Sequence, residues 1–458
     1  RIPAHDPRPA LDTEFPGLES LLRGAGGDGG TGTTCIAVGH AHIDTAWLWP
    51  LAETRRKCLR TFATVDRLME RCPDFRFLCS QAQQYRWIRE DSPALFERIA
   101  TRVREGRWEP GGAMWIEPDC NAPSGESFIR QILHGTGWWE SAFGTDAAQR
   151  HLYLPDTFGF PASLPQIVIG SGLDTFITNK ISWCERNRFP HVSFDWIGID
   201  GTSVLTHLTP GHNYNSSILP EDLRFAERNV ASLDEAAMPT WLQPYGFGDG
   251  GGGPTVEQIE RIEWMARGVE GLPRVEFGRA DDFCGRLHAD ADRRRTEVDG
   301  PARWDGELYL ELHRGTYTSH QWLKQANHRA ESSLRSIELL ACGDPAASPA
   351  SIVEIRERID ETWKTVLLNQ FHDILPGSSI KEVYDDARVQ MDAVAETCGE
   401  ALGDGLTGWA ASLDATGLDA PVLIYNPAST PRGGIVDVDG ELLPVATIPA
   451  VSAVLADA

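Results

Sequence analysis

The sequence predicts a multidomain α/β protein whose main domain is a seven-stranded, barrel-like α/β fold. Three observations support this fold class. Residues 33–283 alternate short apolar runs with amphipathic stretches, a pattern that favours a parallel sheet with helices between its strands. Residues 319–408 change to long stretches of helical periodicity. Residues 420–445 alternate apolar and polar side chains around Gly and Pro, which indicates β-structure.

These changes of character predict four segments along the chain. With 458 residues, the chain is too long for one ordinary domain. Residues 1–32 end in GAGGDGGTG and are expected to form a glycine-rich lead-in. The barrel-like domain is expected over 33–300, a three-helix bundle over 301–412, and the start of a β-sandwich over 413–458.

The expected strands of the main domain are seven short apolar runs. Between them lie helical stretches such as 54–71, where Leu59, Phe62, Val65 and Leu68 share one face. Parallel strands of this kind can close into a barrel, and catalytic groups then lie just past their C-terminal ends. The runs cover residues 34–39, 75–79, the approach to 111–116, 151–155, 175–179, 204–208 and 244–248.

The expected bundle rests on three helical stretches. The first covers residues 321–341. The other two show apolar residues at helical spacing, which predicts three packed helices. These residues are Ile352, Ile355, Ile359, Trp363 and Val366 in one stretch, and Ile380, Val383, Ala387, Met391 and Val394 in the other.

Composition excludes several classes of partner. The formal net charge of −24 argues against nucleic acid and anionic membranes, because both need a basic surface. No apolar run is long enough to span a bilayer. The nine cysteines form no CxxC pair or regular framework, so we expect reduced core thiols in a cytoplasmic protein. An acidic surface is compatible with a neutral substrate such as a glycan.

Three short stretches carry His and Asp residues where the chain leaves a predicted strand or helix. GHAHIDTAWLWP supplies His42 and Asp44, YLPDTFGF supplies Asp156, and NQFHDILPG supplies His372. Two imidazoles and two carboxylates suit Zn²⁺ or a similar cation. His40 is a competing ligand, and each stretch alone also fits a structural role, such as a helix N-cap for Asp156.

A second set of residues could perform acid–base chemistry. Asp249 lies in GDGGGGPT, where glycines permit close approach of the backbone to a ligand. A partly desolvated carboxyl group there could serve as a general acid, although a flexible acidic turn has the same composition. Asp156 could bind a metal through one oxygen and attack a substrate through the other. Asp373 could orient the His372 imidazole. A metal and two functionally distinct carboxylates would suit a glycosidase.

Six ordered blocks, from about residue 33 to the C-terminus, resemble the glycoside hydrolase family 38 α-mannosidases, and most closely the cytosolic and bacterial branch. The blocks are GHAHIDTAWLWP, GGAMWIEPDCNAPSGES, LPDTFGF, YGFGDGGGGPT, GELYLELHRGTYTS and FHDILPGSS. The resemblance implies an α/β domain, a three-helix bundle and β-sandwich domains. It also implies hydrolysis of mannose-containing oligosaccharides or small α-mannosides by double displacement with retention, and a possible homo-oligomer.

The resemblance also implies roles for individual residues. Asp156 would be the nucleophile and Asp249 the general acid/base. The metal, usually zinc and sometimes cobalt, would bind His42, Asp44, Asp156 and His372. The residues expected to contact the sugar are Trp47, Asp373, Arg314 and Tyr317.

Two other readings stay open from the sequence. A metal-dependent polysaccharide deacetylase also uses Asp and His ligands on a barrel-like α/β fold, but it needs no carboxylate nucleophile. A glycan-binding protein with an inactive site would not need Asp156 and Asp249. The glycosidic linkage is not indicated by any motif.

Overall fold

The computed structural model describes residues 30–147, 149–233, 238–343 and 348–457. Within these residues the chain forms two compact units. The first unit runs up to Ser319 and includes a later segment, Phe371–Val383. The second comprises His320–Gln370 and the described residues from Tyr384 onward.

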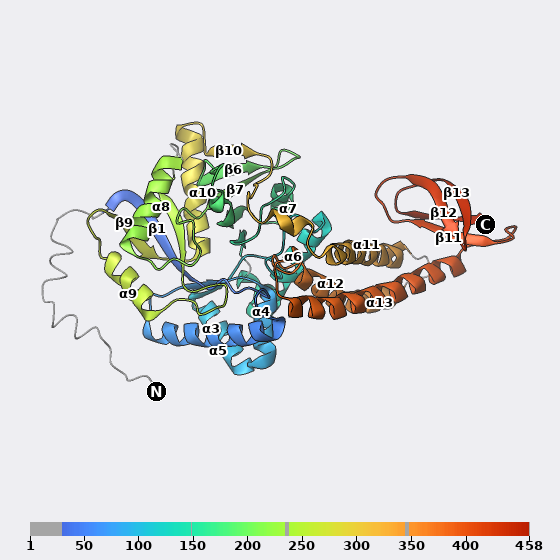
Figure 1. Ribbon diagram of the computed structural model, residues 1–458, viewed down its shortest axis with the longest axis horizontal. Coiled ribbons are helices and arrows are strands. Elements are labelled where there is room, and N and C mark those ends of the chain that lie inside the picture. Colours follow the sequence, from blue (N-terminus) through green and yellow to red (C-terminus); the bar gives the residue numbers. More distant parts are fainter. Residues whose placement is uncertain (1–29, 148, 234–237, 344–347, 458) are drawn as a thin grey trace. The chain divides into compact units, whose positions relative to one another are not determined.

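The first unit contains two five-stranded sheets (Figure 1). One has the order β3–β2–β1–β8, with β9 also paired to β1, and all its pairs are parallel. The other has the order β10–β6–β7–β5–β4 and is parallel except between β6 and β7. The strands are β1 (Gly30–His40), β2 (Phe77–Cys79), β3 (Trp108–Pro110), β4 (His151–Leu154), β5 (Thr175–Thr178), β6 (Ser193–Ile197), β7 (Ser203–Leu208), β8 (Thr240–Tyr245), β9 (Leu272–Phe277) and β10 (Ala302–Asp305).

Helices connect most of these strands. In α3 the apolar residues Phe62, Val65 and Leu68 are buried on one face, as the periodicity predicts. Ser124 caps α6, and Thr255 and Gln258 form a capping box on α9. The helices are α3 (Leu51–Arg71), α4 (Ala82–Asp91), α5 (Pro93–Arg104), α6 (Gly125–Phe143), α7 (Leu164–Gly170), α8 (Pro220–Leu233), α9 (Val256–Met265) and α10 (Ala280–Glu297).

The two sheets share one hydrophobic core. Ile36 and Leu242 of the first sheet and Ile177 and Leu205 of the second belong to the same cluster of buried side chains, together with Phe283 of α10. The carboxyl ends of parallel strands point the same way. The rings of His40, at the end of β1, and Tyr153, in β4, lie 5.2 Å apart, so residues that follow β1 and β4 can meet although these strands lie in different sheets.

The expected closed, seven-stranded barrel is wrong for the described residues, whose strands pair in two separate sheets. The strand expected on the approach to 111–116 is β3, and the chain bends immediately after it, over residues 112–116. Gly112 has a φ of 80° and Ala113 one of 63°, and this left-handed backbone cannot continue a strand. The additional strands β6, β9 and β10 were not predicted, because charged residues and a proline interrupt their apolar patterns.

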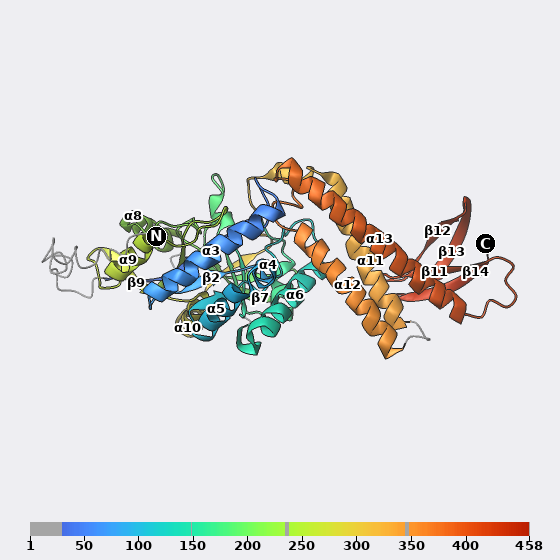
Figure 2. The ribbon, with the colours of Figure 1, turned by 90° about the horizontal axis from the view of Figure 1, so that it is seen from below.

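The second unit contains long helices and short β-pairs (Figure 2). The helices are α11 (Gln321–Gly343), α12 (Pro349–Asn369) and most of α13 (Lys381–Ser412). Asn369 donates to Gln390 (2.7 Å), and Arg358 pairs with Glu400 (2.7 Å), so α12 packs beside α13. Two antiparallel pairs follow, formed by β11 (Pro421–Asn426) with β14 (Ser452–Asp457) and by β12 (Arg432–Val438) with β13 (Glu441–Ile448).

The bent segment after β3 packs tightly on α6. The amide of Trp115 donates to the main-chain carbonyl of Gln131 (2.8 Å), and the amide of Ile116 donates to the side-chain oxygen of Gln131 (3.2 Å). Gly135, one turn along the helix, leaves no room for a side chain, because a Cβ atom would overlap the Ala113 carbonyl and lie 2.8 Å from the Met114 Cα. Helix α6 therefore fixes the backbone that leads to Glu117.

We expect Gly135→Ala to destabilise the protein by about 1–3 kcal/mol, because the added methyl group overpacks this contact. Gly137→Ala on the same helix is the matched control, since a Cβ atom there meets nothing within 4 Å. The control should gain about 0.5–1 kcal/mol from helix propensity. Thermal unfolding of both variants tests the contact, and equal stabilisation by both would contradict it.

Candidate metal centre and active-site cavity

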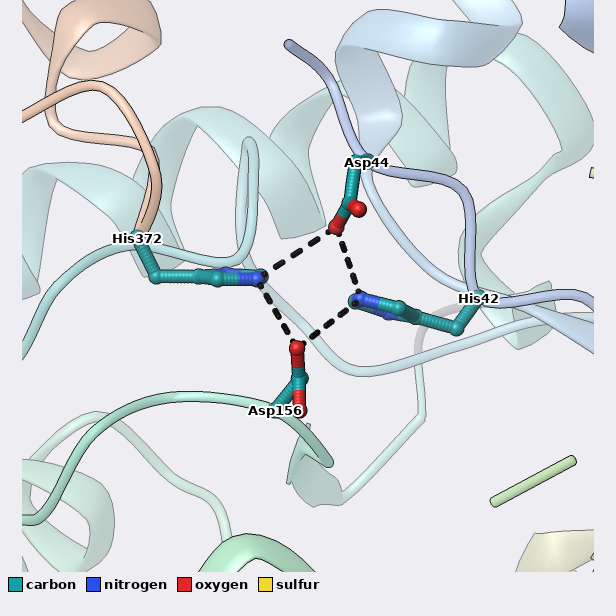
Figure 3. Close-up of side chains that lie close together, drawn as sticks. All are labelled: His42, Asp44, Asp156 and His372. Atoms are coloured by element: carbon teal, nitrogen blue, oxygen red, sulfur yellow. Dashed lines mark ion pairs between the residues drawn. The ribbon is translucent and has the colours of Figure 1, made fainter. Parts of the chain in front are cut away.

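Four side chains from distant parts of the sequence converge in the first unit (Figure 3). His42 and Asp44 follow β1, Asp156 follows β4, and His372 lies in the turn that follows α12. Each offers one nitrogen or oxygen atom, and these atoms all lie within 4.8 Å of one another. The cluster contains the four expected ligands. His40, the competing ligand, is not part of it.

The facing atoms alternate between nitrogen and oxygen. His42 Nε2 lies 3.0 Å from Asp44 Oδ1 and 3.8 Å from Asp156 Oδ2. His372 Nε2 lies 3.6 Å from Asp44 Oδ1 and 3.7 Å from Asp156 Oδ2. His42 Nε2, His372 Nε2 and Asp44 Oδ1 are buried and make no hydrogen bond of regular geometry. Because buried polar atoms normally have partners, this set of donor atoms fits a divalent cation held by two imidazoles and two carboxylates.

The pKa shifts of the cluster also favour the presence of a cation. Burial opposes a charge on His42, but the Glu117 and Asp44 carboxylates outweigh burial and raise the pKa of His42 well above its ordinary value. Burial likewise opposes ionisation of Asp44, yet the adjacent His372 and His42 imidazoles lower the pKa of this carboxyl group. Buried carboxylates therefore surround the two imidazoles with negative charge, which favours a cation at this point, either a proton on the ring or a metal ion in its place.

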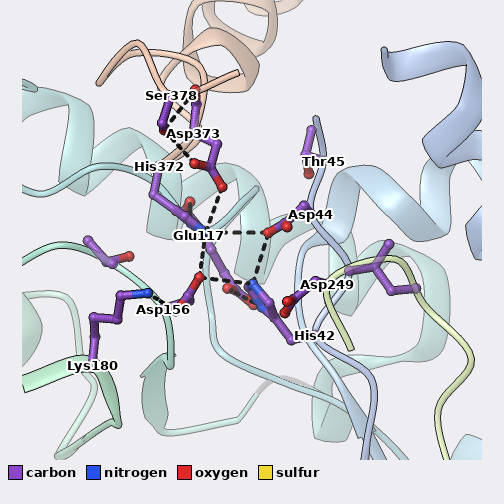
Figure 4. Close-up of polar contacts among 12 residues, drawn as sticks. His42, Asp44, Thr45, Glu117, Asp156, Lys180, Asp249, His372, Asp373 and Ser378 are labelled. Atoms are coloured by element: carbon purple, nitrogen blue, oxygen red, sulfur yellow. Dashed lines mark hydrogen bonds and ion pairs between the residues drawn. The ribbon is translucent and has the colours of Figure 1, made fainter. Parts of the chain in front are cut away.

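Glu117 orients both imidazoles, and the sequence analysis did not identify it. Its Oε2 atom lies 3.0 Å from His42 Nδ1 (Figure 4). The Ser80 hydroxyl donates to its Oε1. The Glu117 main-chain carbonyl lies 2.9 Å from His372 Nδ1 and accepts from the His372 amide (3.2 Å). Partners of this kind leave Nε2 of each ring available to a metal. Glu117 lies in the block GGAMWIEPDCNAPSGES, but nothing in that pattern marks the carboxylate.

A cavity of about 430 Å³ opens beside this cluster. Asp44 and Asp156 lie in its wall, and so does Asp249 from the glycine-rich loop. The volume falls in the usual range for small-molecule sites. Its other lining residues are Trp47, Phe158, Lys180, Trp183, Tyr214, His313, Gly315, Thr316, Ser319, Asp373, Gly377 and Ser378.

The Asp249 loop is anchored at several points. The Asp44 amide donates to the Asp249 carbonyl (2.9 Å), and the Gly252 amide donates to the Thr61 hydroxyl (2.9 Å). Asp249 has a φ of 50°, a left-handed conformation that Asp tolerates better than most residues. The Tyr214 hydroxyl donates to Asp249 Oδ1 (3.3 Å). Burial, followed by the charges of Asp156 and Asp249, raises the pKa of Tyr214, so this hydroxyl stays protonated.

Asp156 has a second polar partner on the side away from the histidines. The Lys180 ammonium donates to Asp156 Oδ1 (2.6 Å) and is itself buried. Lys180 begins a short 3₁₀ helix directly after β5. No sequence motif points to Lys180, although its position just past the predicted strand 175–179 is a usable signal.

The expected sugar-contacting residues fall into two groups. Trp47 and Asp373 line the cavity, and Ser378 donates to the Asp373 carboxylate. Burial raises the pKa of Asp373 to about 7, and the charge of His372 acts in the opposite direction. Arg314 and Tyr317 are not among the lining residues. The Arg314 guanidinium instead lies 4.3 Å from the ring centre of Tyr309 and 4.5 Å from that of Tyr317.

Two broader expectations can also be compared with the structure. All nine cysteines are free thiols, and eight of them are buried, as expected for core thiols. Among the described residues, no helix is both long enough and apolar enough to cross a membrane.

Comparisons with known proteins agree with the family resemblance. Residues 32–307 match the glycosyl hydrolases family 38 N-terminal domain, and residues 311–407 match the α-mannosidase middle domain. The crystal structure of an α-mannosidase from Enterococcus faecalis V583 aligns with 88% of this chain and 46% of that chain at a TM-score of 0.70. The two share 20% sequence identity, so this likeness shows a common fold.

Relatives in other organisms are much more similar in sequence. α-Mannosidase G of Dictyostelium discoideum is 42% identical over 77% of this chain and 31% of its own length. Human α-mannosidase 2C1 is 41% identical over 83% of this chain and 35% of its own length. The chain thus spans about a third of these relatives. With a domain match over residues 32–307 and this level of identity, the chain belongs to glycoside hydrolase family 38.

Proposed function

We propose that this protein is a metal-dependent, retaining α-mannosidase. Its substrates would be mannose-containing oligosaccharides or small α-mannosides with a terminal α-linked mannose. The observation that carries the proposal is the cavity whose wall holds Asp44 and Asp156 of the candidate metal centre together with Asp249. Three relatives, from Dictyostelium discoideum, human and Saccharomyces cerevisiae, are named α-mannosidases, which supports the substrate class.

His42, Asp44, Asp156 and His372 would hold the metal, with Zn²⁺ as the expected ion and Co²⁺ as the alternative. When bound, the cation would supply positive charge for vicinal hydroxyls of the mannose ring. Glu117 and Ser80 would fix the imidazole of His42, and the Glu117 carbonyl would fix that of His372. Trp47 would provide a flat apolar surface for the sugar ring.

The chemistry would proceed in two displacements. Asp249 would protonate the glycosidic oxygen while a carboxylate oxygen of Asp156 attacks the anomeric carbon and the bond to the leaving group breaks. Asp249, now ionised, would then take a proton from water as the water oxygen displaces Asp156. Retention requires the two carboxyl groups to lie about 5–5.5 Å apart. Tyr214, whose hydroxyl donates to Asp249, would help to hold that carboxyl group in place.

We expect hydrolysis of an aryl α-mannoside by the full-length protein to fall at least about a thousandfold in Asp156→Asn, because the nucleophile is lost. In Asp249→Asn, kcat/KM, which reports the first displacement, should fall about 10²–10⁴-fold with a poor leaving group and much less with dinitrophenolate, which needs no protonation. Asp292→Asn, on a largely exposed carboxylate, is the control. Acetate release from acetylated glycans, without cleavage of mannosides, would support a deacetylase instead.

We expect chelation to abolish activity, and Zn²⁺ or Co²⁺ to restore it.

Glu117→Gln should weaken metal binding by about 10–100-fold, because His42 loses the carboxylate that orients its ring. The dissociation constant, measured by competition with a chromophoric chelator, tests this directly. Glu97→Gln, on an exposed position of α5, is the matched control. Unchanged metal affinity in Glu117→Gln would contradict the assigned role.

A further inference from the structure

Lys180 is a buried cation placed on the outer oxygen of Asp156. Its ammonium lies 2.6 Å from Asp156 Oδ1, and the side chain is only 4% exposed. The other oxygen, Oδ2, faces the two histidines of the candidate metal centre. The carboxylate thus has a buried lysine on one oxygen and the two histidines of the candidate metal centre on the other (Figure 4).

Aromatic rings hold the Lys180 ammonium in this position. It lies 3.8 Å from the ring centre of Trp183 and 5.3 Å from that of Phe158. Contacts with ring faces favour a cation even where water is excluded. Phe158, Lys180 and Trp183 all line the same cavity as Asp156. A charge this close to a carboxylate and only 4% exposed interacts strongly with it, because little water screens the pair.

We propose that Lys180 promotes release of the sugar from Asp156 in the second half of the reaction. This inference rests on the proposed function. In the covalent intermediate Asp156 is an ester without net charge, whereas before and after it is a carboxylate with a full negative charge. Lys180 therefore stabilises the carboxylate much more than the ester. Lys180 acts through Asp156, because it positions this carboxylate and balances the negative charge of the carboxylate.

The consequence differs between the two steps. In the second step the bond between the anomeric carbon and the Asp156 oxygen breaks, and its electron pair returns to the carboxylate. Negative charge develops beside Lys180, so the lysine lowers this barrier. In the first step the carboxylate loses charge as it attacks, so the same lysine gives no comparable help. In this role Lys180 acts through its charge and transfers no proton.

The test is pre-steady-state kinetics of the full-length protein with dinitrophenyl α-mannoside. In Lys180→Gln we expect the release step to slow on the order of ten- to a hundredfold, while the initial burst of dinitrophenol approaches one per active site. Both kcat and KM should fall together, because the intermediate accumulates. Intact mass spectrometry should detect one mannosyl adduct, and added azide should accelerate turnover by attacking the intermediate.

Two further variants separate charge from structure. Lys180→Arg keeps the charge and should restore release towards the wild-type rate. Trp183→Leu removes one ring beneath the ammonium and should shift release in the same direction as Lys180→Gln, by a smaller factor. Thermal unfolding and metal content are measured for all three, so that loss of the fold is recognised.

Several outcomes would overturn the inference. If Lys180→Gln slows both steps equally without a burst, or raises KM with kcat unchanged, then Lys180 contacts substrate or supports the fold instead. If Lys180→Arg behaves like Lys180→Gln, charge is not the property that matters. A wild-type protein that neither turns over the mannoside nor forms an adduct at Asp156 would overturn the proposed function, and this inference with it.

Discussion

The central constraint on this molecule is the desolvation of several ionisable groups at one point. His42, Asp44 and His372 are almost fully buried, and removal of such groups from water is costly unless each finds a partner. Glu117 meets much of that requirement, with its side chain near His42 and its carbonyl near His372. The remaining atoms point at one another, where a cation would complete the set. The bend after β3 and its packing on α6 are what bring Glu117 to this position.

Asp156 lies at the boundary between two environments. One oxygen faces the buried histidines, and the other meets a lysine held among aromatic rings at the cavity wall. A carboxylate with a different partner on each oxygen has little freedom to rotate. The Asp249 loop is restrained by its hydrogen bonds to the Asp44 amide and the Thr61 hydroxyl. Both carboxylates are therefore pre-positioned, which is a common requirement for catalysis of group transfer.

Part of this arrangement could be predicted from the sequence. His42, Asp44 and Asp156 follow predicted strands, and the rule that catalytic groups lie just past the C-terminal ends of strands predicted one site for them. The structure confirms that they meet, although β1 and β4 lie in different sheets. Glu117 and Lys180 were missed for a physical reason. Each acts on a residue that only the fold brings near, and the contact between Glu117 and His372 joins residues 255 positions apart. The division of the strands into two sheets was not predicted, because an apolar run indicates a strand but does not specify the neighbour with which it pairs. The bend after β3 was also missed, since composition alone does not specify a φ angle at alanine.

The segment Phe371–Val383 belongs to the first compact unit, although the chain leaves that unit after Ser319 and forms α11 and α12 before it returns. The fourth ligand, His372, arrives only with this returning segment. During synthesis, a nascent chain would therefore hold an incomplete cluster until His372 has left the ribosome. Contacts with such large sequence separation form slowly, so the complete ligand set marks a late stage of folding. Measurable affinity for a metal ion would then show that the chain has returned to the first unit after forming α11 and α12.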